Sequence, residues 1–260
     1  MYRLDREEFL RPRQVSLWSL LGFQAGYINA FGFLACGRFV SHVTGFGTQL
    51  GLSLGGQKLS FALEMLGFPV SFILGSFLSG TITIARIERG EKPHFESVML
   101  VLPMILLMLI LLGHRGLFGP FGEQLVQFHD FILLYLLSLV CGMQNGCFAT
   151  LTRGQIRTTH LTGISTDIGT DFARLWLGHL KGEELKLTRM ANFSRISTFL
   201  SFSCGSVISV LVSRALEYYA LMIPFATSIG VLIAVRLMSL ELDRKYQSEL
   251  KPTVNPNTHL

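Results

Sequence analysis

The sequence predicts an all-α integral membrane protein with six transmembrane helices. They form two inverted three-helix repeats, with interrupted segments after the first and fourth helices. Three observations predict this fold class: an apolar composition, six long apolar runs and a motif that occurs twice. Of the 260 residues, 50% are hydrophobic and only 15% are charged, which is far from the usual soluble mixture.

The apolar runs define the predicted helices. A helix needs about 20 mostly apolar residues to cross roughly 30 Å of hydrocarbon, where it must satisfy its own backbone polar groups. The third run, VMLVLPMILLMLILLG, is the clearest, and the serines of the fifth favour a face turned toward protein. In chain order the runs are Val15 to Cys36, Leu59 to Ala85, Ser97 to Gly113, Phe131 to Thr152, Ile196 to Ser213 and Tyr218 to Met238.

Lysine and arginine gather on one side of this topology. Assigning all 22 to alternate sides of six spans places 18 with the two termini and 4 on the other side. Basic loops remain in the cytoplasm, so both termini are expected there. The net charge of +5 is explained by these loops, and no nucleic-acid partner is expected.

We expect one membrane domain over residues 15–238, with repeat 1 at about 15–115 and repeat 2 at about 128–238. It is flanked by a cytoplasmic N-tail, residues 1–14, and a cytoplasmic C-tail, residues 239–260. The polar end of the C-tail, rich in Pro, Asn and Thr, is expected to be disordered.

The duplicated motif reads His-x-Thr-Gly-x-x-Thr-x-x-Gly. It occurs in SHVTGFGTQLG, Ser41 to Gly51, and again in THLTGISTDIG, Thr159 to Gly169. A Gly-x-x-Asn-small match precedes each copy, in GYINA and GMQNG, and corresponding residues lie 116 to 118 positions apart. Each copy follows the first helix of a three-helix half. Because three crossings are an odd number, the second half enters the bilayer from the opposite side.

Inverted repeats with Gly-rich interruptions build one midplane site in many transporters. An interrupted backbone at membrane depth is tolerated only where protein or water covers it, so each copy is expected to fold inward. We expect a short helix from about Thr44 or Thr162, capped by that threonine. The predicted substrate-binding residues are Asn29, His42, Thr44, Gly45, Gln49, Asn145, His160, Thr162 and Gly163.

Asp167 and His160 are the predicted ion-coupling residues. The counterpart of Asp167 in the first repeat is the neutral Gln49, so the two halves are unequal, and an ionisable group at membrane depth usually serves a function. Structural alternatives remain open. The histidines could brace backbone carbonyls, Asp167 could pair with Arg174 two turns along, and the two asparagines could tie helices together.

The predicted function is a secondary transporter or permease for a small polar solute. A passive channel that uses the same site is one alternative, and an intramembrane enzyme with His160 and Asp167 as acid and base is another. The sequence lacks the phosphate-loop, nucleophile-elbow and zinc-protease motifs, and it lacks metal-ligand spacings. No enzymatic activity, cofactor or metal is therefore expected. The expected partners are the lipid bilayer and the solute, and a unit this small is compatible with a homodimer.

The segments GYINAFGFLACGRFVSHVTGFGTQLG and GMQNGCFATLTRGQIRTTHLTGISTDIG resemble the YoaK family of bacterial membrane proteins, over about Val15 to Met238. The resemblance implies six spans and a location in the bacterial inner (plasma) membrane. Family members are commonly described as small-molecule permeases without an established substrate. Many carry Asp at the position of Asn29, whereas the RTTHLTG sequence is intact at Arg157 to Gly163.

Overall fold

The computed structural model describes residues 10–57, 59–91, 94–123, 128–152, 154 and 158–250, and every regular element in this part of the chain is helical. A short 3-10 helix, η1, joins the last two α-helices. In chain order the elements are α2 (Pro12–Cys36), α3 (Val43–Gly55), α4 (Leu59–Glu88), α5 (Phe95–His114), α6 (Phe128–Leu151), α7 (Leu161–Leu177), α8 (Gly182–Leu216), η1 (Glu217–Leu221) and α9 (Met222–Leu250).

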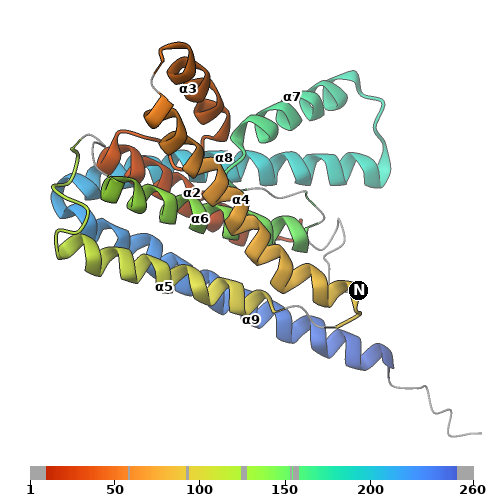
Figure 1. The fold of residues 1–260 in the computed structure, drawn as a ribbon. Helices are drawn as coiled ribbons and strands as arrows, with labels where there is room; N and C mark the ends of the chain where they lie inside the picture. Colours follow the sequence, from red (N-terminus) through yellow and green to blue (C-terminus); the bar gives the residue numbers. More distant parts are fainter. Residues whose placement is uncertain are drawn as a thin grey trace, which may run out of the picture.

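The long helices have the length and composition that crossing a membrane requires. Five segments qualify: Pro12–Cys36, Leu59–Glu88, Phe95–His114, Phe131–Leu151 and Gly182–Glu241. The last is 60 residues long and contains α8, η1 and most of α9. Figure 1 shows the chain reversing its direction between α8 and α9. The chain therefore has the architecture of a multi-pass membrane protein.

Two helices are longer than the apolar runs predict. Helix α8 begins at Gly182, well before the predicted start at Ile196, and α9 continues to Leu250, beyond the predicted end at Met238. Both extensions lack proline and contain Leu, Glu, Lys and Arg, which favour helix. An apolar run marks only the part of a helix suited to hydrocarbon, so it underestimates helices that continue past that layer.

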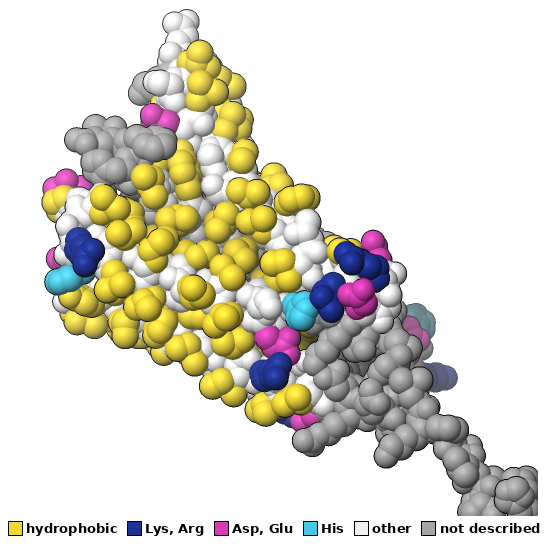
Figure 2. All heavy atoms as spheres, turned by 60° about the horizontal axis from the view of Figure 1, so that its bottom comes forward, with side chains coloured by type: hydrophobic (Ala, Val, Ile, Leu, Met, Phe, Trp, Pro, Cys, Tyr) yellow, Lys and Arg dark blue, Asp and Glu magenta, His cyan; other side chains and the backbone are white. Residues whose placement is uncertain are grey.

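The outer face of α5 and α9 is apolar. The two helices pack against each other, and Figure 2 shows hydrophobic side chains over this face, with charged side chains gathered toward its ends. Leu100, Met104 and Leu111 on α5 and Ile233 and Leu237 on α9 are all exposed. An apolar surface this continuous is unfavourable in water and is suited to lipid.

Two helix pairs form the centre of the molecule: α2 with α8, and α4 with α6. In the first pair the two backbones touch at glycines. A Cβ on Gly26 would lie 2.0 Å from the carbonyl oxygen of Phe202, and a Cβ on Gly205 would lie 2.1 Å from the carbonyl oxygen of Phe23. Ser206 Oγ donates a hydrogen bond to the carbonyl of Gly26 at 3.1 Å. Only glycine allows helices in a membrane to approach this closely.

The pair of α4 and α6 repeats this contact. A Cβ on Gly142 would lie 2.1 Å from the carbonyl oxygen of Phe72, and a Cβ on Gly75 would lie 2.2 Å from that of Leu139. Ser76 Oγ donates to the carbonyl of Gly142 at 2.9 Å. Each pair therefore has contacting glycines on both helices and a serine hydrogen bond across the crossing.

Replacement of a crossing glycine should destabilise the fold. Gly26→Ala and Gly142→Ala should each lower the free energy of unfolding by about 1–3 kcal/mol or more, because the new methyl group forces two backbones apart. Thermal unfolding of the purified protein in detergent would measure the loss. The control is Gly230→Ala in α9, where a Cβ meets nothing within 4 Å. Equal melting temperatures for the crossing variants and this control would contradict the described packing.

Candidate functional site

Each copy of the motif begins at a break between helices. Helix α2 ends at Cys36, and Gly37 has a φ of +67° and donates its backbone N–H to the carbonyl of Phe33 at 2.8 Å. After α6, Gly154 has a φ of +81° and donates to the carbonyl of Ala149 at 2.7 Å. This left-handed conformation disfavours a Cβ, which explains a glycine at both ends.

A matched asparagine fastens the chain after each break. Asn29 Oδ1 accepts hydrogen bonds from the backbone N–H of Ser41 at 3.1 Å and from its hydroxyl at 3.2 Å. Asn145 Oδ1 accepts from the backbone N–H of Thr159 at 3.4 Å and from the hydroxyl of Thr158 at 3.1 Å. Asn145 Nδ2 also donates to the hydroxyl of Thr159. Both side chains thus hold the segment that leads into the motif helix.

A histidine precedes each motif helix. His42 stands immediately before α3 with φ −88° and ψ 66°, and His160 stands before α7 with φ −99° and ψ 66°. The carbonyl of His42 accepts a hydrogen bond from the N–H of Phe46 at 3.1 Å, and that of His160 accepts one from Ile164 at 3.3 Å. The two helices therefore start with the same backbone geometry.

The predicted threonine caps are wrong. Thr44 and Thr162 are the second residues of α3 and α7, because the histidines occupy the capping position. Both threonines are exposed, and their carbonyls accept hydrogen bonds from the hydroxyls of Thr48 at 3.2 Å and Thr166 at 3.0 Å.

The glycine three residues after each histidine allows a close approach of the imidazole ring. A Cβ on Gly45 would lie 2.6 Å from His42 Nδ1, and a Cβ on Gly163 would lie 2.5 Å from His160 Nδ1. Each ring therefore folds over the first turn of its helix, where backbone N–H groups lack partners within the helix. The His-x-x-Gly spacing has this local cause in both copies.

The two motif helices project from one side of the bundle. Helix α3 packs against α4, and α7 packs against α8. Figure 1 shows both on the same side of α2, α4, α6 and α8. Gly45, Gln49 and Gly163 are partly buried. The predicted site residues of each repeat therefore lie around the break of that repeat. Helices α3 and α7 do not pack against each other.

Asp167 belongs to an ion-pair cluster between α7 and α8. Its carboxylate lies 3.4 Å from Nε of Arg195, and the side chain is 56% exposed. Arg195 also pairs with the buried Asp171 at 2.5 Å, and Arg174 lies 3.5 Å from Asp171. The partner of Asp167 is therefore Arg195 on the next helix, whereas Arg174, the alternative that the sequence suggested, pairs with Asp171.

A buried amide network was not predicted from the sequence. Gln24 Nε2 donates to Gln144 Oε1 at 3.2 Å and to Ser228 Oγ at 2.9 Å, and Gln24 Oε1 accepts from Thr227 at 2.9 Å. Gln144 Nε2 in turn donates to Thr158 Oγ1 at 2.9 Å. The network joins α2, α6 and α9 to the second break. The signal that could have found it is a glutamine inside an apolar run, since buried amides need partners.

The chemistry available around the two breaks is that of hydrogen bonds and a few charges. No group of three or more His, Cys, Asp or Glu side chains suited to a metal ion occurs in the part of the chain that the structure describes. Amides, hydroxyls, imidazoles and the Asp167–Arg195 pair can bind a small polar solute by donating and accepting hydrogen bonds.

The family model described as "Protein of unknown function (DUF1275)" matches residues 17–234, which include both motif copies. No curated protein and no solved structure matches the chain.

The contact between histidine and glycine gives a test of the motif. Gly45→Ala should lower the free energy of unfolding by about 0.5–1.5 kcal/mol, because its methyl group overlaps the exposed His42 ring and forces this side chain out of its rotamer. The double variant His42→Ala/Gly45→Ala should recover most of that loss, as should the matched pair His160→Ala/Gly163→Ala. Thermal unfolding of singles and doubles measures the coupling between the two positions. Losses that simply add would contradict the described ring position.

Proposed function

Since the chain belongs to the DUF1275 family of proteins of unknown function, we propose its role from its own geometry: a secondary transporter or permease for a small polar solute. The observation that carries the proposal is the matched geometry of the two breaks. Each has a left-handed glycine, an asparagine tether and a histidine folded over glycine. Matched interruptions in corresponding halves are typical of transporters that expose one site alternately to each side.

The proposed architecture has six spans, α2, α4, α5, α6, α8 and α9, in two halves of opposite orientation. A twofold operation that exchanges α2 with α6 also exchanges α8 with α4. The crossing glycines obey this exchange, since Gly26 against Phe202 has its counterpart in Gly142 against Phe72. With three spans in each half, the exchange requires an axis in the membrane plane. The resemblance to the YoaK family agrees with this architecture.

The proposed solute site lies along the motif faces of α3 and α7. The solute would contact the exposed hydroxyls of Thr44 and Thr162, Gln49 and the two imidazoles. The proposed coupling group is Asp167. Protonation of its carboxylate would remove its attraction for Arg195, which would keep its second partner, Asp171. His160 would assist at the N-terminal end of α7. A proton or small cation could thus change the contact between α7 and α8.

The proposed assembly is a homodimer. Thr44, Thr48, Thr162 and Thr166 are exposed in the single chain, and Asp167 is half exposed. Polar and charged side chains at membrane depth are costly unless protein or water covers them. A second copy that covers the side from which α3 and α7 project would enclose both motif faces and complete the chamber.

A ligand screen tests the proposed site. Purified protein would be heated with each member of a metabolite library, and solutes that raise the melting temperature would be retested with His42→Ala and His160→Ala. A solute bound along the motif faces should lose its effect in both variants, provided that each variant still unfolds cooperatively. Solutes that stabilise both variants as well as the wild type would contradict the proposed site.

Flux through reconstituted vesicles distinguishes the mechanisms. With a labelled solute from the screen, Asp167→Asn should abolish accumulation driven by a proton gradient, because the amide cannot carry the proton. Exchange of solute at equal concentrations on both sides should persist. Flux unchanged by Asp167→Asn would favour a passive channel, and chemical conversion of the solute in detergent would favour an enzyme. The control is Glu184→Gln in the first turn of α8.

Cross-linking tests the homodimer. In a Cys204→Ser background, Leu52→Cys on α3 should form a disulfide-linked dimer on mild oxidation, because this position is 72% exposed on the side assigned to the second copy. Leu211→Cys on α8, at 67% exposure, is the matched control and should remain monomeric. Equal cross-linking at the two positions would contradict the assigned interface.

A further inference from the structure

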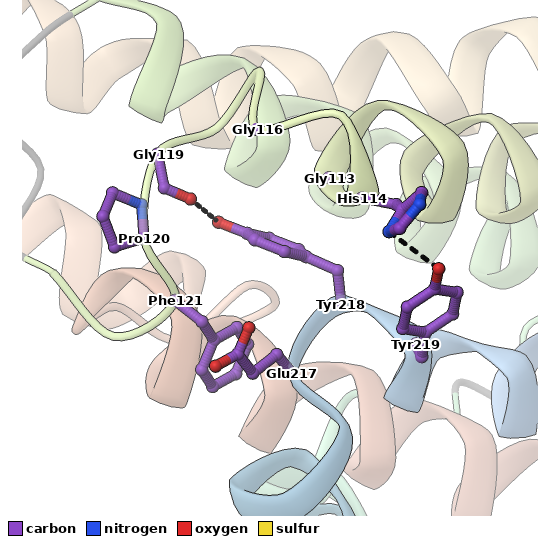
Figure 3. Close-up of a pocket in the computed structure, with 9 residues that line it drawn as sticks. All are labelled: Gly113, His114, Gly116, Gly119, Pro120, Phe121, Glu217, Tyr218 and Tyr219. Carbon is purple, nitrogen blue, oxygen red and sulfur yellow. Dashed lines mark hydrogen bonds between the residues drawn. The ribbon is translucent and has the colours of Figure 1, made fainter.

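A cavity of about 370 Å³ lies where α5 ends and η1 joins α8 to α9. Figure 3 shows its walls, which come from the end of α5, the loop that follows it and η1. The hydrogen bond from Gly122 N–H to the carbonyl of Ala35 joins this loop to the end of α2 at 3.2 Å. The cavity shares no lining residue with the predicted solute site, so it is a separate feature.

Aromatic side chains form much of the cavity wall, and other contacts hold them in place. Tyr218 is buried, and its hydroxyl donates to the carbonyl of Gly119 at 3.1 Å. The ring of Phe121 stands nearly perpendicular to that of Tyr218, with centroids 5.5 Å apart. The hydroxyl of Tyr219 is hydrogen-bonded to Nδ1 of His114 at 2.7 Å. Three aromatic rings are thus positioned around the space before any ligand arrives.

Glu217 places a carboxylate beside these rings. Its side chain lines the same cavity, as Figure 3 shows. Among the residues that the structure describes, this carboxylate has no hydrogen bond and no ion-pair partner. The backbone of Glu217 has φ +47° and ψ −125°, a conformation that a residue with a Cβ rarely adopts and that costs free energy. Glycine would suit this corner better than glutamate does.

We propose that this cavity binds an alkylammonium group. Aromatic faces attract cations through their ring quadrupoles, and groups of aromatic rings are the usual site for a methylated ammonium. The carboxylate of Glu217 adds a Coulomb attraction for the same charge. An anion would be repelled by Glu217. A divalent metal prefers several oxygen ligands, and Glu217 is the one carboxylate among the residues that line the cavity. The ammonium could belong to a soluble amine or to a lipid headgroup, because the cavity lies at the ends of the long apolar helices.

The test uses choline as the probe and 3,3-dimethylbutan-1-ol, its uncharged carbon isostere, as the comparison. The protein would be held in phosphatidylglycerol nanodiscs, which offer no ammonium headgroup, and binding would be measured by equilibrium dialysis of labelled ligand. Choline should bind about tenfold more tightly than the isostere, which is the preference that a cation–π site gives. Equal affinity for the two probes, or no binding of choline, would overturn the proposal.

Variants distinguish binding of choline in the cavity from attraction of choline to surface charge in general. Glu217→Gln should weaken choline binding by about threefold or more, whereas Glu123→Gln, an exposed carboxylate outside the cavity lining, should leave it unchanged. Glu217→Gly should raise the melting temperature, because glycine adopts the positive φ freely, and should also lose choline. Unchanged binding in both Glu217 variants would overturn the proposal.

A second arm distinguishes the sources of the ammonium. Nanodiscs that contain phosphatidylcholine would be compared with pure phosphatidylglycerol. A headgroup site predicts that phosphatidylcholine competes with labelled choline, and a site for a soluble amine predicts unchanged binding. Either result supports an alkylammonium site, provided that the Glu217 variants have lost choline binding.

Discussion

The close approach of helix backbones at glycine is the constraint on which the rest of the structure depends. In a bilayer, lipid tails are as apolar as leucine, so helices gain little from hydrophobic burial and associate through packing and hydrogen bonds. Gly26 and Gly205 bring α2 and α8 together, and Gly142 and Gly75 do the same for α6 and α4. A side chain at any of these positions would separate the helices that carry both breaks. The positions of the two breaks therefore depend on how α2 packs against α8 and how α6 packs against α4.

Short-range contacts also determine the backbone geometry of the motif. One glycine ends a helix, an asparagine holds the returning chain and a histidine folds over the next helix start. These contacts explain the pattern of residue types without a ligand, and they leave other atoms available. The hydroxyls of Thr44 and Thr162 and the Asp167 carboxylate face outward. The motif thus contains both residues that hold the backbone and exposed polar groups that make no such contact.

The sequence predicts those parts of the structure that depend on residues close together in the chain. Apolar runs predict the long helices, and the repeated Gly-x-x-Asn and His-x-Thr-Gly patterns correspond to repeated geometry. The parts that the sequence did not predict depend on contacts between residues far apart in the chain. Nothing local links Asp167 to Arg195 or Gln24 to Gln144, and no propensity rule says that α3 and α7 pack on different helices. Apolar length also does not predict the polar extension of α8 that begins at Gly182.

The central claim is that the two motif helices belong to halves of opposite orientation that share one solute site. Its most direct measurement uses Thr44→Cys and Thr162→Cys, each in a Cys204→Ser background, with a membrane-impermeant maleimide added to right-side-out or inside-out vesicles. We expect preferential labelling of the two positions from opposite sides, and protection of both by the same solute. Labelling of both positions from one side only, with the solute protecting neither, would contradict it.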